Sequence, residues 1–194
     1  MTQDSLDRRA VAATLVTDRK DLLVVSGLGA ATWDLAAAGD HDLNFYLWGA
    51  MGGAAVMGLG LALAQPTRPV LVLTGDGEML MGLGSLASIA VAAPANLSIV
   101  VLDNCHYGET GMQASHTAHG ADLVEIARAA GIGDSRRVDD KAKLAELSAR
   151  IRRPEGCLFA LVPIAVEEPP RVLPPRDAVV LKSRFRKALG LAET

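Results

Sequence analysis

The stretch that decides the fold is Val70-Leu71-Val72-Leu73-Thr74-Gly75-Asp76-Gly77-Glu78. Its first half is an unbroken apolar and β-branched run, which predicts a strand that is buried on both faces, as in a parallel sheet. The Gly-Asp-Gly turn ends this strand, and residues 79–92 have the length and composition of a helix. A glycine-rich turn between a strand and a helix directs backbone N–H groups at one point. Residues 75–78 therefore predict a place for an anion.

The same alternation of strand and helix extends in both directions from this turn. Further strands are predicted at residues 22–25, 97–102 and 157–162, and residues 44–48 are predicted to be a strand or a loop. Further helices are predicted at 32–38, 50–64, 122–130, 139–152 and 178–189. This alternation indicates an α/β fold, a three-layer, doubly wound and mostly parallel sheet with helices on both faces. We expect residues 1–165 to form this domain. Residues 166–194 are expected to be a proline-rich tail and a C-terminal helix that packs on the domain or on a partner.

The composition fits one globular domain and excludes several classes of protein. The chain has 194 residues, of which 50% are hydrophobic and 21% are charged, as in a folded rather than a disordered protein. Its net charge of −3 offers no basic field for nucleic acid. The apolar residues 49–64 are fewer than the roughly 20 that span a membrane, and the N-terminus has no apolar leader segment. We therefore expect a cytoplasmic protein that binds neither nucleic acid nor a membrane.

Polar residues follow two of the predicted strands. Asp76 follows the strand at 70–74, and Asn104, 28 positions later, follows the strand at 97–102. Because the carboxyl ends of neighbouring parallel strands lie close together, one carboxylate and one amide oxygen can bind one divalent ion there. Each residue alone is more often a turn or capping residue, but the pair indicates a magnesium–diphosphate site. The turn at 26–31 lacks the third glycine of a dinucleotide fingerprint, so a nicotinamide or flavin site is not indicated.

On these residues the sequence resembles the thiamine diphosphate enzymes. The spacing of Leu, Gly and Pro from Leu59 to Gly77 matches the Gly-Asp-Gly signature of that family, and Asn104 ends it at the usual distance. The resemblance covers most of residues 22–162 and implies the thiamine diphosphate-binding fold, with thiamine diphosphate and Mg²⁺ as cofactors. It departs at Glu78, where the family usually has a small residue, so we expect the local diphosphate contact to differ.

The resemblance also implies roles for individual residues. It implies that Asp76, Asn104 and the backbone carbonyl of His106 ligate Mg²⁺. Met51 matches the bulky residue that wedges the cofactor into its bent conformation, and the Gly49 carbonyl would accept a hydrogen bond from the aminopyrimidine. The other residues implied in cofactor binding, several of them through backbone N–H groups, are Gly29, Ala30, Ala31, Gly75, Gly77, Glu78, Tyr107 and Gly108.

A partner chain follows from the resemblance as well. The family activates the cofactor with a glutamate that lies in a separate pyrimidine-binding domain, and this sequence has no second run of strands and helices for that domain. The resemblance therefore implies a pyrimidine-binding α subunit that supplies the glutamate, in a hetero-oligomer that holds each cofactor between two chains. The small residues 52–55 suit a closely packed interface, although a core helix would look the same.

Within the family, the resemblance is closest to the decarboxylases of sulfopyruvate and phosphonopyruvate. The residues that carry it are 49–52, 75–89, 107–113 and 185–189. The implied reaction is the non-oxidative decarboxylation of a small 2-oxo acid, its substrate, to an aldehyde. No catalytic residue is certain in this chain. His106 and Glu109 are candidates because they lie in the polar loop that follows Asn104.

Two other functions are compatible with the sequence. The β subunit of a 2-oxoacid:ferredoxin oxidoreductase has a similar Tyr-Gly-x-Thr-Gly loop, but Cys105 and Cys157 do not form an iron–sulfur motif. A non-catalytic cofactor-binding subunit is the second, and intact Asp76 and Asn104 argue against it. The sequence leaves open the identity of the 2-oxo acid, the stoichiometry, the identity of the partner, and the roles of His116, His119, Gln113 and the tail.

Overall fold

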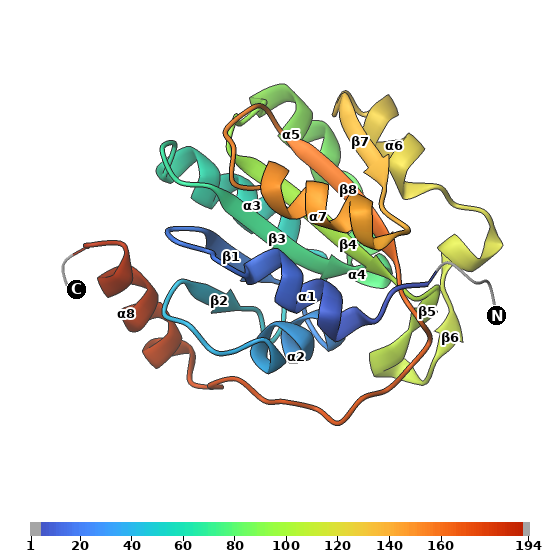
Figure 1. Ribbon diagram of the computed structural model, residues 1–194, viewed down its shortest axis with the longest axis horizontal. Helices are drawn as coiled ribbons and strands as arrows, with labels where there is room; N and C mark the ends of the chain where they lie inside the picture. The colour runs from blue at the N-terminus through green and yellow to red at the C-terminus, as the bar shows by residue number, and fades with distance from the viewer. Residues whose placement is uncertain (1–4, 192–194) are drawn as a thin grey trace.

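A six-stranded parallel sheet forms the centre of the molecule (Figure 1). The structure is a computed structural model that describes residues 5–191. The strands are β1 (Leu23–Ser26), β2 (Asn44–Tyr46), β3 (Val70–Gly75), β4 (Leu97–Asp103), β7 (Asp134–Arg137) and β8 (Leu158–Pro163). Their order is β2-β1-β3-β4-β8-β7, and every neighbouring pair is parallel. The predicted α/β fold is therefore confirmed.

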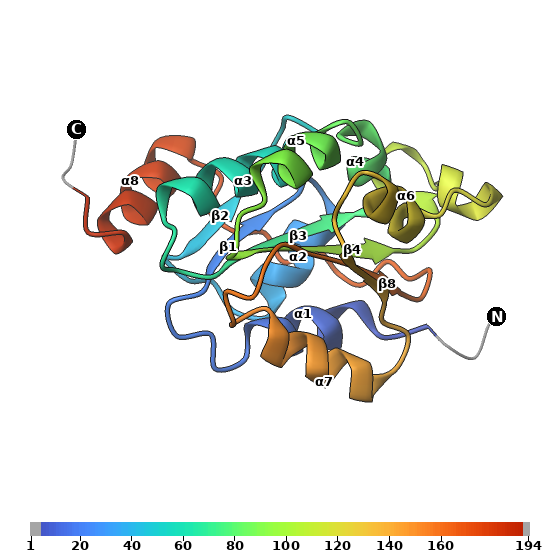
Figure 2. The same ribbon diagram turned by 90° about the horizontal axis from the view of Figure 1, so that it is seen from above.

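Helices cover both faces of this sheet (Figure 2). One layer consists of α3 (Ala54–Ala64), α4 (Asp76–Met81), α5 (Ser85–Ala92) and α6 (Leu123–Ala129). The opposite layer consists of α1 (Arg8–Val16), α2 (Ala30–Ala37) and α7 (Lys141–Arg150). No helix within residues 5–191 is long and apolar enough to cross a membrane.

The central strand β3 shows why the sheet needs a continuous apolar sequence. Val70 and Val72 pack in the core cluster on the α3–α5 side, whereas Leu71 and Leu73 pack in the cluster on the α1–α7 side. All four side chains are completely buried. A strand that is covered on both faces has no solvated side, so it shows no alternation of apolar and polar residues.

The structure differs from the sequence analysis at one predicted helix and at one strand that was not predicted. The helix predicted at residues 79–92 is two helices, α4 and α5, because Gly82 and Gly84 interrupt it and glycine disfavours a continuous helix. Strand β7 was not predicted, since its sequence Asp-Ser-Arg-Arg has no apolar run. Among the described residues it is an edge strand that pairs only with β8, and charged side chains are common on such edges.

The polar loop after Asn104 contains short elements of its own. They are β5 (His106–Tyr107), the 3₁₀ helix η1 (Gly108–Thr110), β6 (Gln113–Ala114) and the 3₁₀ helix η2 (His116–His119). Strands β5 and β6 pair antiparallel and form a small hairpin beside the carboxyl end of β4. The loop therefore consists of short regular elements at the edge of the sheet and is not an extended linker.

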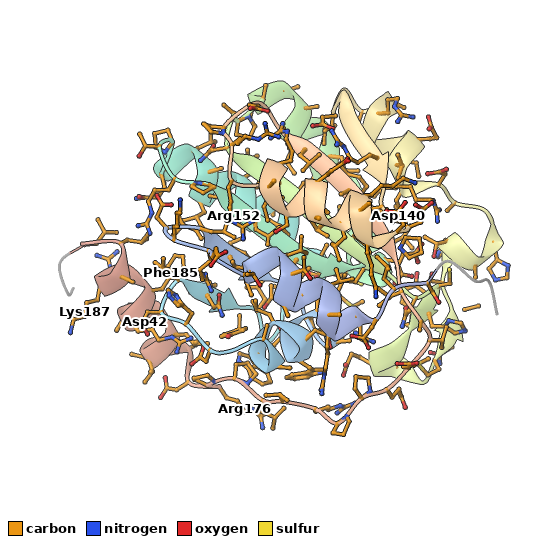
Figure 3. The ribbon with its side chains drawn as sticks, viewed as in Figure 1. Asp42, Asp140, Arg152, Arg176, Phe185 and Lys187 are labelled. Atoms are coloured by element: carbon orange, nitrogen blue, oxygen red, sulfur yellow. The ribbon has the colours of Figure 1, made fainter. Side chains whose placement is uncertain are left out.

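The tail crosses the molecule as an extended strap, which we define as residues 166–177. Trp48 Nε1 donates a hydrogen bond to the Pro175 carbonyl at 2.9 Å, and the Arg176 guanidinium lies 5.1 Å from the Trp48 ring centre. Figure 3 shows Arg176 on this strap and Phe185 on the following helix, α8 (Ala178–Ala188). The helix predicted at 178–189 is thus present.

Helix α8 covers the β2 edge of the sheet. The rings of Phe45 and Phe185 meet edge to face, with centroids 5.5 Å apart. Phe185 belongs to the core cluster of one layer and Leu181 to that of the other. Helix α8 lies beyond residue 165 and still contributes to both core clusters. The boundary between a domain and a tail at residue 165 stays a prediction.

Candidate functional site

A cavity of about 350 Å³ lies at the carboxyl ends of β3 and β4. Parallel sheets commonly bind ligands at this position. The predicted site residues that line it are Ala30, Ala31, Met51, Gly75, Asp76, Gly77, Glu78, Asn104, His106, Tyr107, Gly108 and Glu109. Gly29 and Gly49 are not among its lining residues; Gly29 lies between the lining residues Leu28 and Ala30, and Gly49 is two residues before Met51. The fold therefore brings together nearly all of the predicted set.

Asp76 is the first residue of α4, where β3 ends, and only 2% of its surface is exposed. Its Oδ2 accepts a hydrogen bond from Ser115 Oγ at 2.5 Å. Burial raises the pKa of Asp76 above its usual value, the hydrogen bond from Ser115 opposes the rise, and the neighbouring Asp103 adds to it. A cation in the cavity would favour the ionised carboxylate.

Asn104 and His106 are held by a tight turn of their own loop. Asn104 Oδ1 accepts a hydrogen bond from the His106 N–H at 3.0 Å, and His106 Nδ1 lies 2.7 Å from the Asn104 carbonyl oxygen. Cys105, between them, has a left-handed backbone with φ of 61°. The imidazole of His106 is thus folded back onto its own loop, and the use of its carbonyl as a metal ligand stays a prediction.

The chemistry of the predicted donor set suits magnesium. Asp76, Asn104 and the His106 carbonyl offer only oxygen atoms, which hard divalent cations prefer. Within residues 5–191, no group of three or more His, Cys, Asp or Glu side chains could hold a metal ion. The predicted set does not need such a group, because only one of its three donors is a carboxylate, and diphosphate oxygens and water would fill the remaining positions.

The cavity also has the features of an anion cradle. The N-cap of helix α2 is Gly29, which makes no side-chain cap hydrogen bond, and Ala30 and Ala31 of the first turn line the cavity. Backbone N–H groups in such a turn are donors for an anion. At the start of α4, a Cβ on Gly77 would meet the Tyr107 ring at 2.5 Å. Glycine is needed there because the ring lies directly on the backbone.

Glu109, one of the two catalytic candidates, lies beside the start of α2. Its Oε1 accepts a hydrogen bond from Trp33 Nε1 at 3.2 Å, and its Oε2 is 3.8 Å from an Arg171 nitrogen. These contacts place its carboxylate between the predicted diphosphate turn and the strap. A catalytic role for Glu109 or His106 stays a prediction.

Several residues of the site were missed by the sequence analysis. Ser115 and Thr117 approach Asp76, and Thr117 Oγ1 also donates to Asp103 Oδ1 at 2.8 Å. The wall opposite the sheet includes residues 167–171 of the strap, together with Trp33. No local sequence pattern identifies these residues, because they are far from Asp76 along the chain and are brought close to it only by folding.

Comparison with known proteins confirms the resemblance. Residues 27–162 match the family described as "Thiamine pyrophosphate enzyme, C-terminal TPP binding domain". Sulfopyruvate decarboxylase from Methanosarcina acetivorans is 34% identical over 187 residues, which cover 95% of this chain and 47% of that protein. Sulfopyruvate decarboxylase subunit beta from Methanothermobacter thermautotrophicus is 41% identical over 145 residues, which cover 75% of each chain.

Solved structures show the same fold. Benzoylformate decarboxylase from Polynucleobacter necessarius has a TM-score of 0.70 at 21% sequence identity, over 85% of this chain and 34% of that one. This chain spans about half the length of the Methanosarcina relative. Since both the family match and these relatives cover most of its residues, the chain belongs to the thiamine pyrophosphate enzymes and contains their C-terminal TPP-binding domain.

Proposed function

We propose that this chain is the diphosphate-binding subunit of a cytoplasmic, magnesium-dependent thiamine diphosphate enzyme. Its reaction would be the non-oxidative decarboxylation of a small 2-oxo acid that resembles sulfopyruvate or phosphonopyruvate. The observation that carries the proposal is one cavity that unites Asp76, Asn104 and His106 with the start of α2. The decarboxylase names of the relatives support the reaction class.

Each group of residues would have a distinct task in this enzyme. Asp76, Asn104 and the His106 carbonyl would hold Mg²⁺, and the hydrogen bond from Ser115 fixes the Asp76 carboxylate. Backbone N–H groups at the start of α2 and α4, among them those of Gly77 and Glu78, would bind the diphosphate. Met51, which lines the cavity, would contact the cofactor.

The reaction breaks one carbon–carbon bond of the substrate. When bound, thiamine diphosphate supplies the electron sink for cleavage of the C1–C2 bond of the 2-oxo acid. Carbon dioxide leaves, a proton takes its place on the former carbonyl carbon, and an aldehyde is released. On this chain, Glu109 is one of several carboxylates that line the cavity, and we propose it as a candidate to hold or move that proton.

The outer side of one helix layer suits the proposed pyrimidine-binding partner. Residues 49–64 and 79–98 contain no charged side chain. We call the exposed apolar side chains of this layer the uncharged face; they are Val56, Met57, Leu63, Met81 and Val91. Large exposed apolar patches mark interaction sites on folded proteins. The occupant we propose is the pyrimidine-binding α chain, because about half of the Methanosarcina relative has no counterpart here and another relative is named a β subunit.

Co-expression tests the function as a whole. This chain and a candidate pyrimidine-binding chain are assayed together and separately, with thiamine diphosphate and Mg²⁺, for CO₂ release from sulfopyruvate, phosphonopyruvate and pyruvate. We expect CO₂ and aldehyde only from the pair. Substrate-dependent reduction of an added electron acceptor, in place of aldehyde release, would favour the ferredoxin oxidoreductase. Full activity of this chain alone would contradict the need for a partner, and tight cofactor binding without turnover would favour a non-catalytic subunit.

Replacement of Asp76 tests the metal site. We expect Asp76→Ala to abolish magnesium-dependent binding of thiamine diphosphate in calorimetry, because the cavity loses its only proposed carboxylate ligand. Circular dichroism should show an intact fold. Asp42→Ala removes an exposed carboxylate and is the matched control. Unchanged cofactor binding by Asp76→Ala would contradict the ligand assignment.

A further inference from the structure

The buried carboxylate of Glu78 is the residue at which this chain departs from the thiamine diphosphate signature. Only 3% of its surface is exposed, although it lies in the first turn of α4 and lines the cavity. An acidic side chain is seldom this deeply buried without hydrogen-bond partners. Its partners therefore show what it does in the fold.

Donors from two separate segments converge on this carboxylate. Thr74 Oγ1, at the end of β3, donates to Glu78 Oε2 at 2.6 Å. The backbone N–H of Ala54, at the start of α3, donates to Oε1 at 3.2 Å. The carboxylate also lies against the backbone of Gly27 in the turn before α2, where an added Cβ would overlap Oε2. One side chain thus joins the turn before α2, the turn before α3 and the end of β3.

The Glu78 carboxylate lies directly against the backbone of the turn before α2. A Cβ on Gly27 would overlap Glu78 Oε2 and would lie 2.7 Å from Thr74 Oγ1. Glycine at position 27 is therefore required by the close approach of the acid, which enters the turn where another side chain would stand. The small residue at 27 and the large residue at 78 fit each other.

The two turns that Glu78 joins are the ones that carry predicted cofactor contacts. Ala54 is three residues after Met51, and Gly27 is two residues before the Gly29-Ala30-Ala31 start of α2. We propose that Glu78 is a positioning residue that holds these two turns at a fixed separation before any ligand binds. A carboxylate suits this task because it only accepts hydrogen bonds and can accept several at once. Preformed contact segments cost less to order when a ligand binds.

This inference rests on the proposed function for its effect on the cofactor, but not for its effect on the turns. Glu78→Gln has nearly the same size and places an NH₂ donor among backbone donors, so hydrogen bonds are lost. In the protein without cofactor, we expect hydrogen exchange at residues 26–30 and 50–55 to become about 10- to 100-fold faster. Thiamine diphosphate and Mg²⁺ should bind about tenfold or more weakly in calorimetry.

A matched control separates positioning from general loss of stability. Leu147→Ala removes a completely buried side chain from α7, in the opposite layer. It should lower the melting temperature, yet leave local exchange at residues 26–30 and 50–55 and the cofactor affinity unchanged. If Glu78→Gln does not fold, Gly27→Ala displaces the same carboxylate and should give the same paired changes.

The outcomes are distinguishable. Faster exchange in both turns, without a matching effect of Leu147→Ala, supports the positioning role. Unchanged exchange in the two turns of a folded Glu78→Gln or Gly27→Ala protein overturns it. If the wild-type protein and its partner bind no thiamine diphosphate, the proposed function fails, and the exchange rates still decide whether Glu78 joins the turns.

Discussion

The two helix layers bury similar inner faces but have different outer faces. Helices α3 and α5 contain no charged residue, whereas α7 has the sequence Lys-Ala-Lys-Leu-Ala-Glu-Leu-Ser-Ala-Arg. On α3 and α5 the exposed positions include Leu63 and Val91, which are 56% and 88% exposed. On α7 the exposed positions are charged or small. Both layers cover the same sheet, so the contrast is confined to the sides that face away from it.

The contrast distinguishes apolar residues that pack on the sheet from apolar residues on the outer side, which packing on the sheet does not require. A helix needs apolar residues on the side that packs on the sheet, and it is free to carry charge on the other side. Layer α1–α7 follows that pattern, and its outer side is suited to water. Layer α3–α5 does not follow it, and the proposed pyrimidine-binding partner would account for the apolar composition of its outer side.

The largest expected effect is the loss of the complex when charge is placed on the uncharged face. Leu63→Asp combined with Val91→Asp would bury two unpaired carboxylates in the proposed interface, at a cost of several kcal/mol. We expect association with the pyrimidine-binding chain, measured by light scattering on a sizing column, to weaken at least about 100-fold.

The control adds the same charge to the other layer. Ala142→Asp combined with Ala149→Asp changes two exposed positions of α7 and should leave association within about threefold, as expected for surface substitutions. Equal effects of the two pairs on association would remove the distinction between the layers.

An intermediate effect is expected on the inner sides, where the layers should behave alike. Leu86 of α5 and Leu147 of α7 are both almost completely buried. Each Leu→Ala replacement should lower the free energy of unfolding in urea by about 2–5 kcal/mol, because it leaves a cavity. A loss below about 1 kcal/mol for one of them would show that its layer is loosely packed.

The smallest effect on stability is expected from the ion pair between Arg184 of α8 and Asp40. Arg184 donates hydrogen bonds to both oxygens of Asp40, and these bonds lower the pKa of Asp40 below its usual value. A lowered pKa stabilises the folded state above the unfolded pKa of about 3.9. This stability is lost as the pH falls through the lower folded value. Because the carboxylate is partly exposed, the gain is below about 1 kcal/mol and shrinks with salt.

Urea titrations at several pH values would detect this contribution. Asp40→Asn should remove the corresponding part of the pH dependence between about pH 5 and pH 2, and Asp42→Asn, at an exposed neighbouring position, should not. A wild-type slope that persists in Asp40→Asn would contradict the assignment to this ion pair.

The fold could be predicted because its central signals are local. The run from Val70 to Thr74 is apolar on both sides of the strand, and the Gly-Asp-Gly turn fixes where α4 begins. Asp76 and Asn104 could be paired because parallel strands end at one edge, and both line the cavity. Tyr107 and Gly108 were identified through the resemblance, and they line it too.

What could not be predicted depends on contacts between distant segments. Strand β7 has polar side chains because only one of its edges pairs, so its sequence resembles a loop. Ser115 lies 39 residues from Asp76, and nothing near it in the sequence marks its hydrogen bond. The strap has the proline-rich composition of a linker, and the fold alone shows that it forms a wall of the cavity.

The position of the strap also has a consequence for the order of synthesis. Residues 75–78 and 104–108, on the sheet side of the cavity, leave the ribosome well before residues 167–171, which form the opposite wall. Domains begin to fold during synthesis, from the N-terminal side onward. The nascent chain therefore has an open cavity first, and the wall is added only when Trp48 and the arginines of α1 acquire the strap's carbonyl groups as partners.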